Sequence, residues 1–94
     1  MRKTKSCNPG WHSATVKIVH REGFHTRPAA QFAEIAQRFA AEVEVRCGRK
    51  KGDGKSILSL LALGAERGDK LTLRTRGPRA EETLKALGKL IQKG

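Results

Sequence analysis

Residues 14–30 read ATVKIVHREGFHTRPAA, and within this stretch a strand pattern gives way to a helix pattern. Apolar side chains alternate with polar ones over 14–19, which is the period of a strand covered on one face. Apolar residues then recur at helical spacing over 26–39. Pro28 fits the first turn of such a helix, because the N–H that it lacks would have no acceptor within the helix. The pattern therefore predicts a strand at 14–19 and a helix that begins at His25 or just after it.

The rest of the chain carries patterns for three further strands and two further helices. The strands are expected at 42–47, at 49–52 as a short basic edge strand, and at 69–75. The helices are expected at 55–64, closed by glycine, and from Pro78 to the end of the chain. This order of half-buried strands and helices is typical of an α+β fold. We expect an open-faced β-sandwich, with a four-stranded antiparallel sheet and three helices on one face (βαββαβα).

Composition limits the class of protein. The chain has 94 residues, which is the size of one domain, and 20 Lys and Arg against 9 Asp and Glu give a formal net charge of +11. That charge favours nucleic acid, anionic lipid or an acidic protein surface as a partner. One Trp, three Phe and no Tyr offer few platforms for bases, so nucleic acid is disfavoured. Cys7 and Cys47 form no CxxC pair, and neither a metal site nor a disulfide is expected.

The first residues differ from the remainder. Residues 1–12 are basic, contain the turn cluster Asn8-Pro9-Gly10 and show no periodicity, so we expect a flexible basic leader before a domain at 13–94. No apolar run is long enough for a signal peptide or a membrane span. The sequence therefore predicts a cytoplasmic protein without membrane insertion. We also expect a monomer that needs no cofactor.

The predicted helix entrance at residues 23–28 carries the candidate reactive groups. His25 lies where the backbone N–H groups of a first helical turn have no acceptor, and the positive helix end favours a neutral, nucleophilic ring. The same N–H groups would stabilise an attached phosphoryl group, whose oxygens Arg27 can bind through its planar guanidinium. Gly23 and Thr26 would shape the backbone of this phosphate site. Spacing alone leaves open that His25 is an ordinary polar residue near a helix start.

Two motifs resemble those of one known family. The octapeptide GFHTRPAA at residues 23–30 closely resembles the active-site signature of HPr, the histidine-containing phosphocarrier of the phosphoenolpyruvate-dependent sugar phosphotransferase system. The segment GKSI at 54–57, followed by Leu60, Leu63 and Gly64, is similar to that family's regulatory serine segment. The resemblance covers about residues 13–94.

The resemblance implies a function. In that family, the histidine that matches His25 accepts a phosphoryl group on Nδ1 from phosphorylated enzyme I. It then donates the group to a sugar-permease A domain or to a regulator, so the protein is a carrier rather than an enzyme. Arg27 would clamp the phosphate. Ser56 matches a serine that an HPr kinase/phosphorylase modifies in some members, but the residue types alone also allow Ser56 to be only a helix N-cap.

The predicted helix at 55–64 suggests a docking surface. At about 100 degrees per residue, Leu60 and Leu63 share one face, and we expect them in the core. The other apolar residues would form an exposed patch beside His25 for a transient partner, with Lys55 attracting acidic surfaces. A helix that is buried all round is the alternative. The predicted docking residues are Phe24, Lys55, Ile57, Leu58 and Leu61.

Glu22 departs from the family pattern, because better-known relatives often have Asn or Ser there. A carboxylate beside a phosphohistidine would repel the phosphoryl dianion. The sequence leaves open whether Glu22 points to solvent or alters the lability of the phosphate. It also leaves open a regulatory docking protein that does not use the histidine, or a nucleic-acid-binding module whose residues 49–51 and basic leader contact phosphates.

Overall fold

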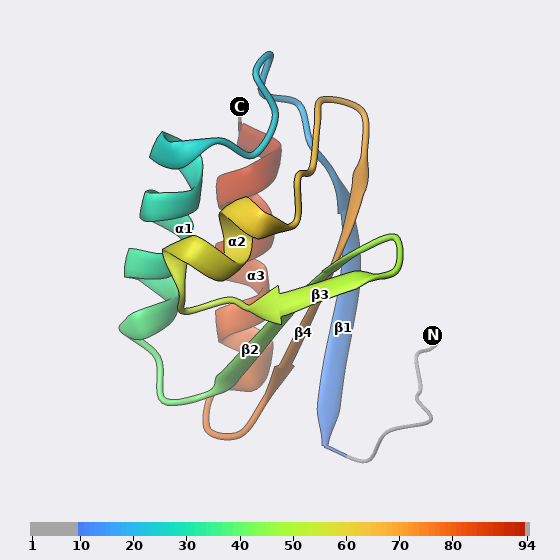
Figure 1. Cartoon of the computed structure of the whole chain (residues 1–94). Helices are drawn as coiled ribbons and strands as arrows, with labels where there is room; N and C mark the ends of the chain where they lie inside the picture. Colours follow the sequence, from blue (N-terminus) through green and yellow to red (C-terminus); the bar gives the residue numbers. More distant parts are fainter. Residues whose placement is uncertain (1–9, 94) are drawn as a thin grey trace.

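The computed structural model describes residues 10–93, and their elements follow in the predicted order (Figure 1). The strands are β1 (Trp11–Lys17), β2 (Glu42–Cys47), β3 (Lys50–Asp53) and β4 (Lys70–Arg76). The helices are α1 (Thr26–Gln37), α2 (Ile57–Ala62) and α3 (Ala80–Lys93). The boundaries differ from the predicted ones by up to three residues, most at the start of β1.

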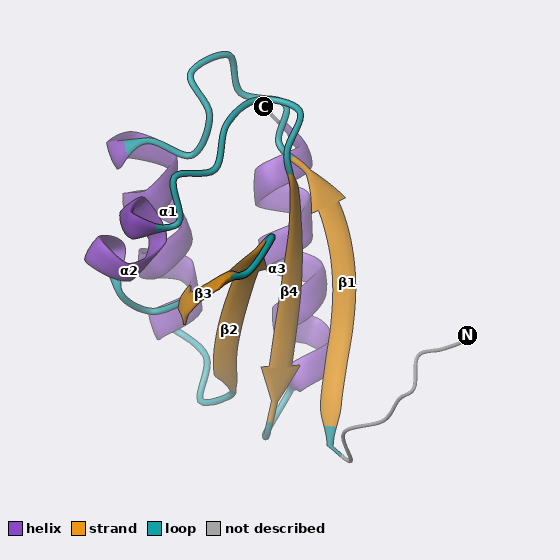
Figure 2. Cartoon of the chain, turned by 45° about the vertical axis from the view of Figure 1, so that its right-hand side comes forward, coloured by secondary structure: helices purple, strands orange, loops and turns teal. Residues whose placement is uncertain are grey.

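The four strands form one antiparallel sheet in the order β1-β4-β2-β3. All three helices lie on one side of this sheet (Figure 2), so the predicted open-faced α+β sandwich is confirmed. The core lies between the two layers. From the sheet it receives alternate residues such as Val45, Leu71 and Leu73, and from the helices Phe32 and Leu87, all with no exposed surface. The period-2 and helical patterns of the sequence therefore correspond to the two faces of this core.

The first strand begins earlier than predicted. Trp11 and His12 were expected in the leader, but they pair with Arg76 and Thr75 of β4 and belong to the sheet. The guanidinium groups of Arg74 and Arg76 lie 4.5 and 4.6 Å from the centre of the Trp11 ring. This cation–π stacking across the strands stabilises the early start of β1. Residues 1–9 of the predicted leader lie outside the described part of the chain, whereas Gly10 is an exposed turn residue directly before β1.

Ion pairs cross the open face of the sheet. Glu44 on β2 accepts a 2.7 Å hydrogen bond from Arg74 Nη1 and a 3.1 Å hydrogen bond from Arg46 Nε. Burial would raise the pKa of the Glu44 carboxyl, but the hydrogen bonds and charges of the two arginines outweigh burial and lower it. Arg76 pairs in the same way with Glu42 at 3.0 Å. The face without helices is thus strongly charged, as a solvent-exposed sheet face requires.

Candidate functional site

His25 occupies the N-cap of α1, as the spacing predicted. Its backbone is extended (φ −93°, ψ −167°), its carbonyl accepts a 3.0 Å hydrogen bond from the Ala29 N–H, and its side chain makes no capping hydrogen bond. The N–H groups of Thr26 and Arg27 find no acceptor within residues 10–93, and Pro28 has no N–H. The entrance of α1 therefore presents unpaired donors next to the imidazole, which is the arrangement that binds anions at helix N-termini.

The loop before His25 is fixed by a second loop at the same end of the molecule (Figure 1). Gly23 has a φ of +76°, and a Cβ there would lie 2.7 Å from the Ala65 carbonyl oxygen. The N–H of Phe24 donates a 2.9 Å hydrogen bond to that same oxygen. Positive φ and the close approach both require glycine at position 23.

Phe24 does not belong to the docking patch, and that prediction is wrong. Its side chain is 5% exposed and packs edge to face against Phe32, with 5.7 Å between ring centres and an 89° angle between planes. Because its backbone N–H is bonded to Ala65, the residue is drawn inward. Phe24 therefore anchors the residue that follows it, His25, to the core.

The imidazole of His25 is 40% exposed, so a partner can reach it. Its Nε2 lies 3.3 Å from Oε1 of Glu22, whose own side chain is 73% exposed. Glu22 is thus directed at the ring. Arg27 is exposed and makes no ion pair or hydrogen bond with any other described residue, which leaves its guanidinium available to an anion.

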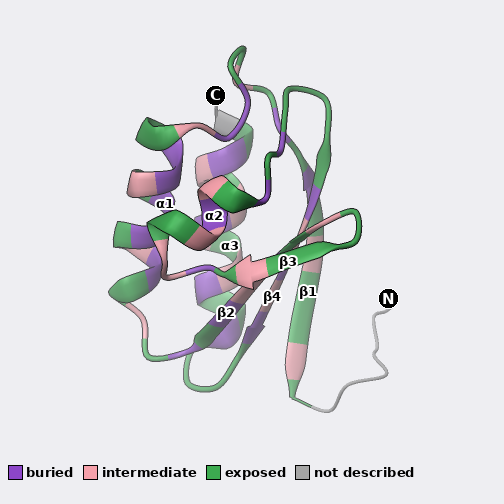
Figure 3. Cartoon of the chain, in the orientation of Figure 1, coloured by how far each residue is buried: buried purple, intermediate pink, exposed green. Residues whose placement is uncertain are grey.

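Ser56 is the N-cap of α2, and its Oγ accepts a 3.2 Å hydrogen bond from the Ser59 N–H. The capping role left open by the sequence is therefore present. Leu60 and Leu63 are buried in the core as predicted, whereas Ile57 and Leu58 are 39% and 79% exposed. Figure 3 shows that the ribbon of α2 carries exposed as well as less exposed stretches. Leu61 is half-buried against the core, so its assignment to an exposed patch is corrected. A six-residue helix packed on α1 turns only part of its apolar surface outward.

Lys55 is held within the fold. Its Nζ donates a 2.8 Å hydrogen bond to the Phe39 carbonyl just beyond the C-terminal end of α1, and its own carbonyl accepts one from Gln37 Nε2. This end of α1 is opposite to the end that carries His25. The predicted attraction of acidic partners by Lys55 is therefore limited, since its ammonium already serves to join α1 to α2.

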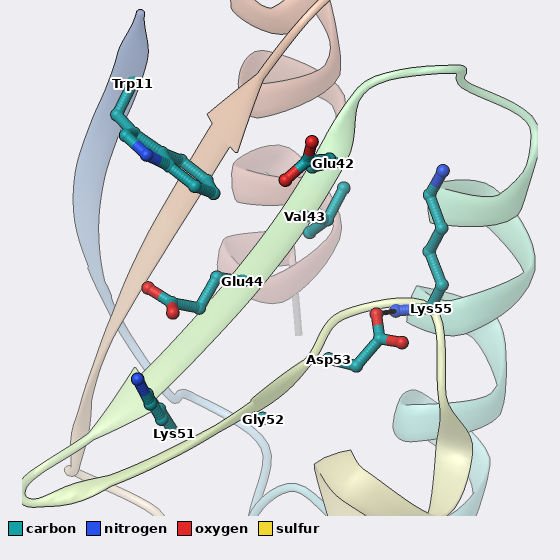
Figure 4. A pocket seen from close by; sticks show the side chains of 8 residues that line it. All are labelled: Trp11, Glu42, Val43, Glu44, Lys51, Gly52, Asp53 and Lys55. Carbon is teal, nitrogen blue, oxygen red and sulfur yellow. Dashed lines mark hydrogen bonds between the residues drawn. The ribbon is translucent and has the colours of Figure 1, made fainter. Parts of the chain in front are cut away.

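A groove on the sheet is separate from the site. Trp11, the carboxylates of Glu42 and Glu44, and Lys51 line it (Figure 4), together with residues that include Asp53 and Lys55. Neither His25 nor Arg27 belongs to it. Among residues 10–93 no cluster of three or more His, Cys, Asp or Glu side chains is arranged to hold a metal ion. No helix in that range is long and apolar enough to span a membrane.

Known proteins are similar to this chain in sequence and in fold. A family model described as the phosphorylation site of the HPr component of the phosphotransferase system matches residues 12–93. The chain is 38% identical over 76 residues to the phosphocarrier protein HPr of Vibrio cholerae, which covers 81% of this chain and 89% of that protein. It is 41% identical over 70 residues to a multiphosphoryl transfer protein of Xanthomonas campestris, which covers 74% of this chain but spans only 8% of that protein's length.

The solved structures agree. The crystal structure of a phosphocarrier protein HPr from Bacillus anthracis superimposes with a TM-score of 0.84 at 33% identity, covering 87% of this chain and 98% of that one. The match of the family model, over residues 12–93, runs from β1 to α3 and includes the helix entrance at His25. The chain therefore belongs to the HPr family, the phosphocarrier proteins of the phosphotransferase system.

Proposed function

We propose that His25 carries the phosphoryl group of this protein. It accepts the group on Nδ1 from phosphorylated enzyme I in the cytoplasm and passes it to a sugar-permease A domain or to a regulator. The observation that carries the proposal is the half-exposed imidazole beside the unpaired N–H groups of Thr26 and Arg27. This surface accepts a phosphoryl group without first losing hydrogen bonds of its own.

The transfer needs one nucleophile and one anion site. The lone pair of Nδ1 attacks phosphorus, the bond between phosphorus and the donor breaks, and its electron pair leaves with the donor. The three phosphoryl oxygens then meet the first-turn N–H groups and the Arg27 guanidinium, which is free of other partners in the described chain. Because the imidazole remains accessible, the reverse attack by an acceptor follows the same path.

Docking involves the exposed start of α2. Ile57 and Leu58 are apolar, exposed and adjacent in the first turn, and they offer a small surface suited to a transient complex. Ser56, which precedes them, is a regulatory site in this proposal, and an HPr kinase/phosphorylase is its partner. A phosphate on Ser56 would place negative charge next to Ile57 and Leu58 and would repel an acidic partner.

The test is phosphorylation with enzyme I and phosphoenolpyruvate, followed by intact-mass analysis. One phosphate that is labile in acid and stable in base is expected on the wild-type chain and is absent from His25→Ala. His20→Ala is the matched control, because it removes another imidazole from the same loop and must leave phosphorylation unchanged. Undiminished label on His25→Ala would refute the assignment.

A further inference from the structure

We infer that Glu22 is a positioning residue for His25. Its carboxylate keeps the imidazole proton on Nε2 and thereby leaves the lone pair of Nδ1 free to attack phosphorus. The inference deepens the proposed function and rests on it, because it names the group that orients the same imidazole.

The inference starts from the close contact between the side chains of Glu22 and His25. Oε1 of Glu22 lies 3.3 Å from Nε2 of His25, three residues along the chain. The backbone between them is fixed, since Gly23 is bent by its positive φ and its N–H donates a 3.1 Å hydrogen bond to the His20 carbonyl. Phe24 holds the next position through its bond to Ala65 and its burial. The exposed Glu22 side chain therefore starts from a backbone that places it against the ring.

The chemistry of the two groups sets the tautomer. A neutral imidazole has one N–H donor and one acceptor nitrogen, whereas an ionised carboxylate can only accept. A carboxylate beside Nε2 therefore favours the form in which Nε2 carries the proton, as carboxylates do when they orient catalytic or metal-binding histidines. The acceptor nitrogen is then Nδ1, which is the nucleophile in the proposed transfer.

The same contact persists through a full cycle. When Nδ1 bonds to phosphorus the ring gains positive charge, and the carboxylate at Nε2 stabilises that charge. When an acceptor takes the phosphoryl group, the electron pair of the N–P bond returns to Nδ1 and the Nε2 proton stays in place. Because Oε1 of Glu22 contacts Nε2, which is not the nitrogen that bonds to phosphorus, its repulsion of the phosphoryl group is reduced. This resolves the conflict that a carboxylate at position 22 presents in the sequence.

The test measures the tautomer and the rate separately. Nitrogen-15 NMR of the unphosphorylated wild-type protein is expected to show His25 mainly protonated on Nε2, with a shift toward the Nδ1-protonated form in Glu22→Gln and Glu22→Ala. Phosphorylation by enzyme I should slow by about two- to fivefold in both variants, the range of an exposed ion pair. Glu34→Gln removes an equally exposed carboxylate on α1 and is expected to change neither quantity.

The outcomes separate the two proposals. A wild-type protein that is phosphorylated on His25, but whose tautomer balance is unaffected by either Glu22 variant, would overturn the role of Glu22 alone. Absence of phosphate from His25 in the wild-type protein would overturn the proposed function, and with it the purpose of the contact. Glu22→Asp, which keeps the charge on a shorter side chain, should recover part of the wild-type tautomer balance.

Discussion

The Ala65 carbonyl oxygen accepts a 2.9 Å hydrogen bond from the backbone N–H of Phe24. The same oxygen leaves no room for a side chain at Gly23, the residue before Phe24. Through this contact the loop after α2 fixes the backbone that leads into His25. The loop is thus part of the site through the contacts of its backbone with Gly23 and Phe24.

Replacement of Gly23 by alanine tests this support. Gly23→Ala combines a positive φ with a Cβ at 2.7 Å from the Ala65 oxygen, and we expect a loss of about 2–4 kcal/mol in unfolding free energy. Gly48→Ala is the matched control, because Gly48 also has a positive φ (62°) but nothing within 4 Å of its Cβ position. Denaturant unfolding should show a cost of about 1–2 kcal/mol for the control. Equal losses of unfolding free energy in the two variants would contradict the close approach of Ala65 to Gly23.

Arg27 is expected to act on the phosphate through two parallel hydrogen bonds. Arg27→Ala should slow phosphorylation by enzyme I about 10- to 100-fold, since a charged hydrogen bond contributes about 1.5–3 kcal/mol. Arg27→Lys should recover little, because an ammonium cannot bind two oxygens in one plane. Arg38→Ala, at the other end of α1, is the control and should behave as wild type. Full activity of Arg27→Lys would show that charge alone suffices.

Replacement of Leu58 is expected to weaken docking without affecting folding. Leu58→Ser removes a side chain that is 79% exposed, so we expect a change in stability within about 0.5 kcal/mol but a raised KM for transfer from enzyme I. Leu60→Ala, two residues along the same helix, should cost about 2–5 kcal/mol because Leu60 has no exposed surface. An unchanged KM in Leu58→Ser would remove the start of α2 from the docking surface.

Ser56 has a measurable structural role beside its proposed regulatory one. Ser56→Ala loses the hydrogen bond to the Ser59 N–H, and the expected cost is about 0.5–2 kcal/mol by denaturant unfolding. Ser56→Asp retains a capping oxygen and should be nearly as stable as wild type, yet it should slow charging of His25. Incubation with ATP and the kinase should give an acid-stable phosphate on Ser56. Phosphorylation of His25 at the wild-type rate in Ser56→Asp would show that Ser56 serves only as a helix N-cap.

Glu44 predicts a specific dependence of stability on pH. The pKa of this carboxyl is lowered in the folded state from its ordinary value of 4.5, so folding favours the ionised form. Its contribution is therefore complete above the ordinary pKa and is lost as pH falls through the lowered folded value. Urea titrations should show Glu44→Gln less stable than wild type near neutral pH, with the difference shrinking below about pH 4.5. A difference that stays constant down to about pH 3 would contradict the pairing with Arg74 and Arg46.

Much of the fold could be predicted because its signals are local. The alternation in β4 and the apolar stripes of the helices place their residues on the core side without reference to distant contacts. The N-cap positions of His25 and Ser56 follow from residues within one turn. These parts of the prediction depend only on the periods of strand and helix.

The errors at Phe24 and Trp11 concern contacts between segments that are distant in sequence, and the direction of Glu22, which the sequence left open, depends on the shape of a loop. Phe24 sits in a loop without periodicity, and only its bond to Ala65 and its packing on Phe32 turn it inward. Trp11 joins β1 because arginines of β4 stack on its ring. The direction of the Glu22 side chain depends on the bend at Gly23, which no local pattern specifies.

The most direct measurement is the site of the phosphate itself. Phosphorus-31 and nitrogen-15 NMR of the chain after treatment with enzyme I and phosphoenolpyruvate should show one phosphoryl group on Nδ1 of His25. Phosphate found on another residue, or on Nε2 where Glu22 lies, would contradict the account.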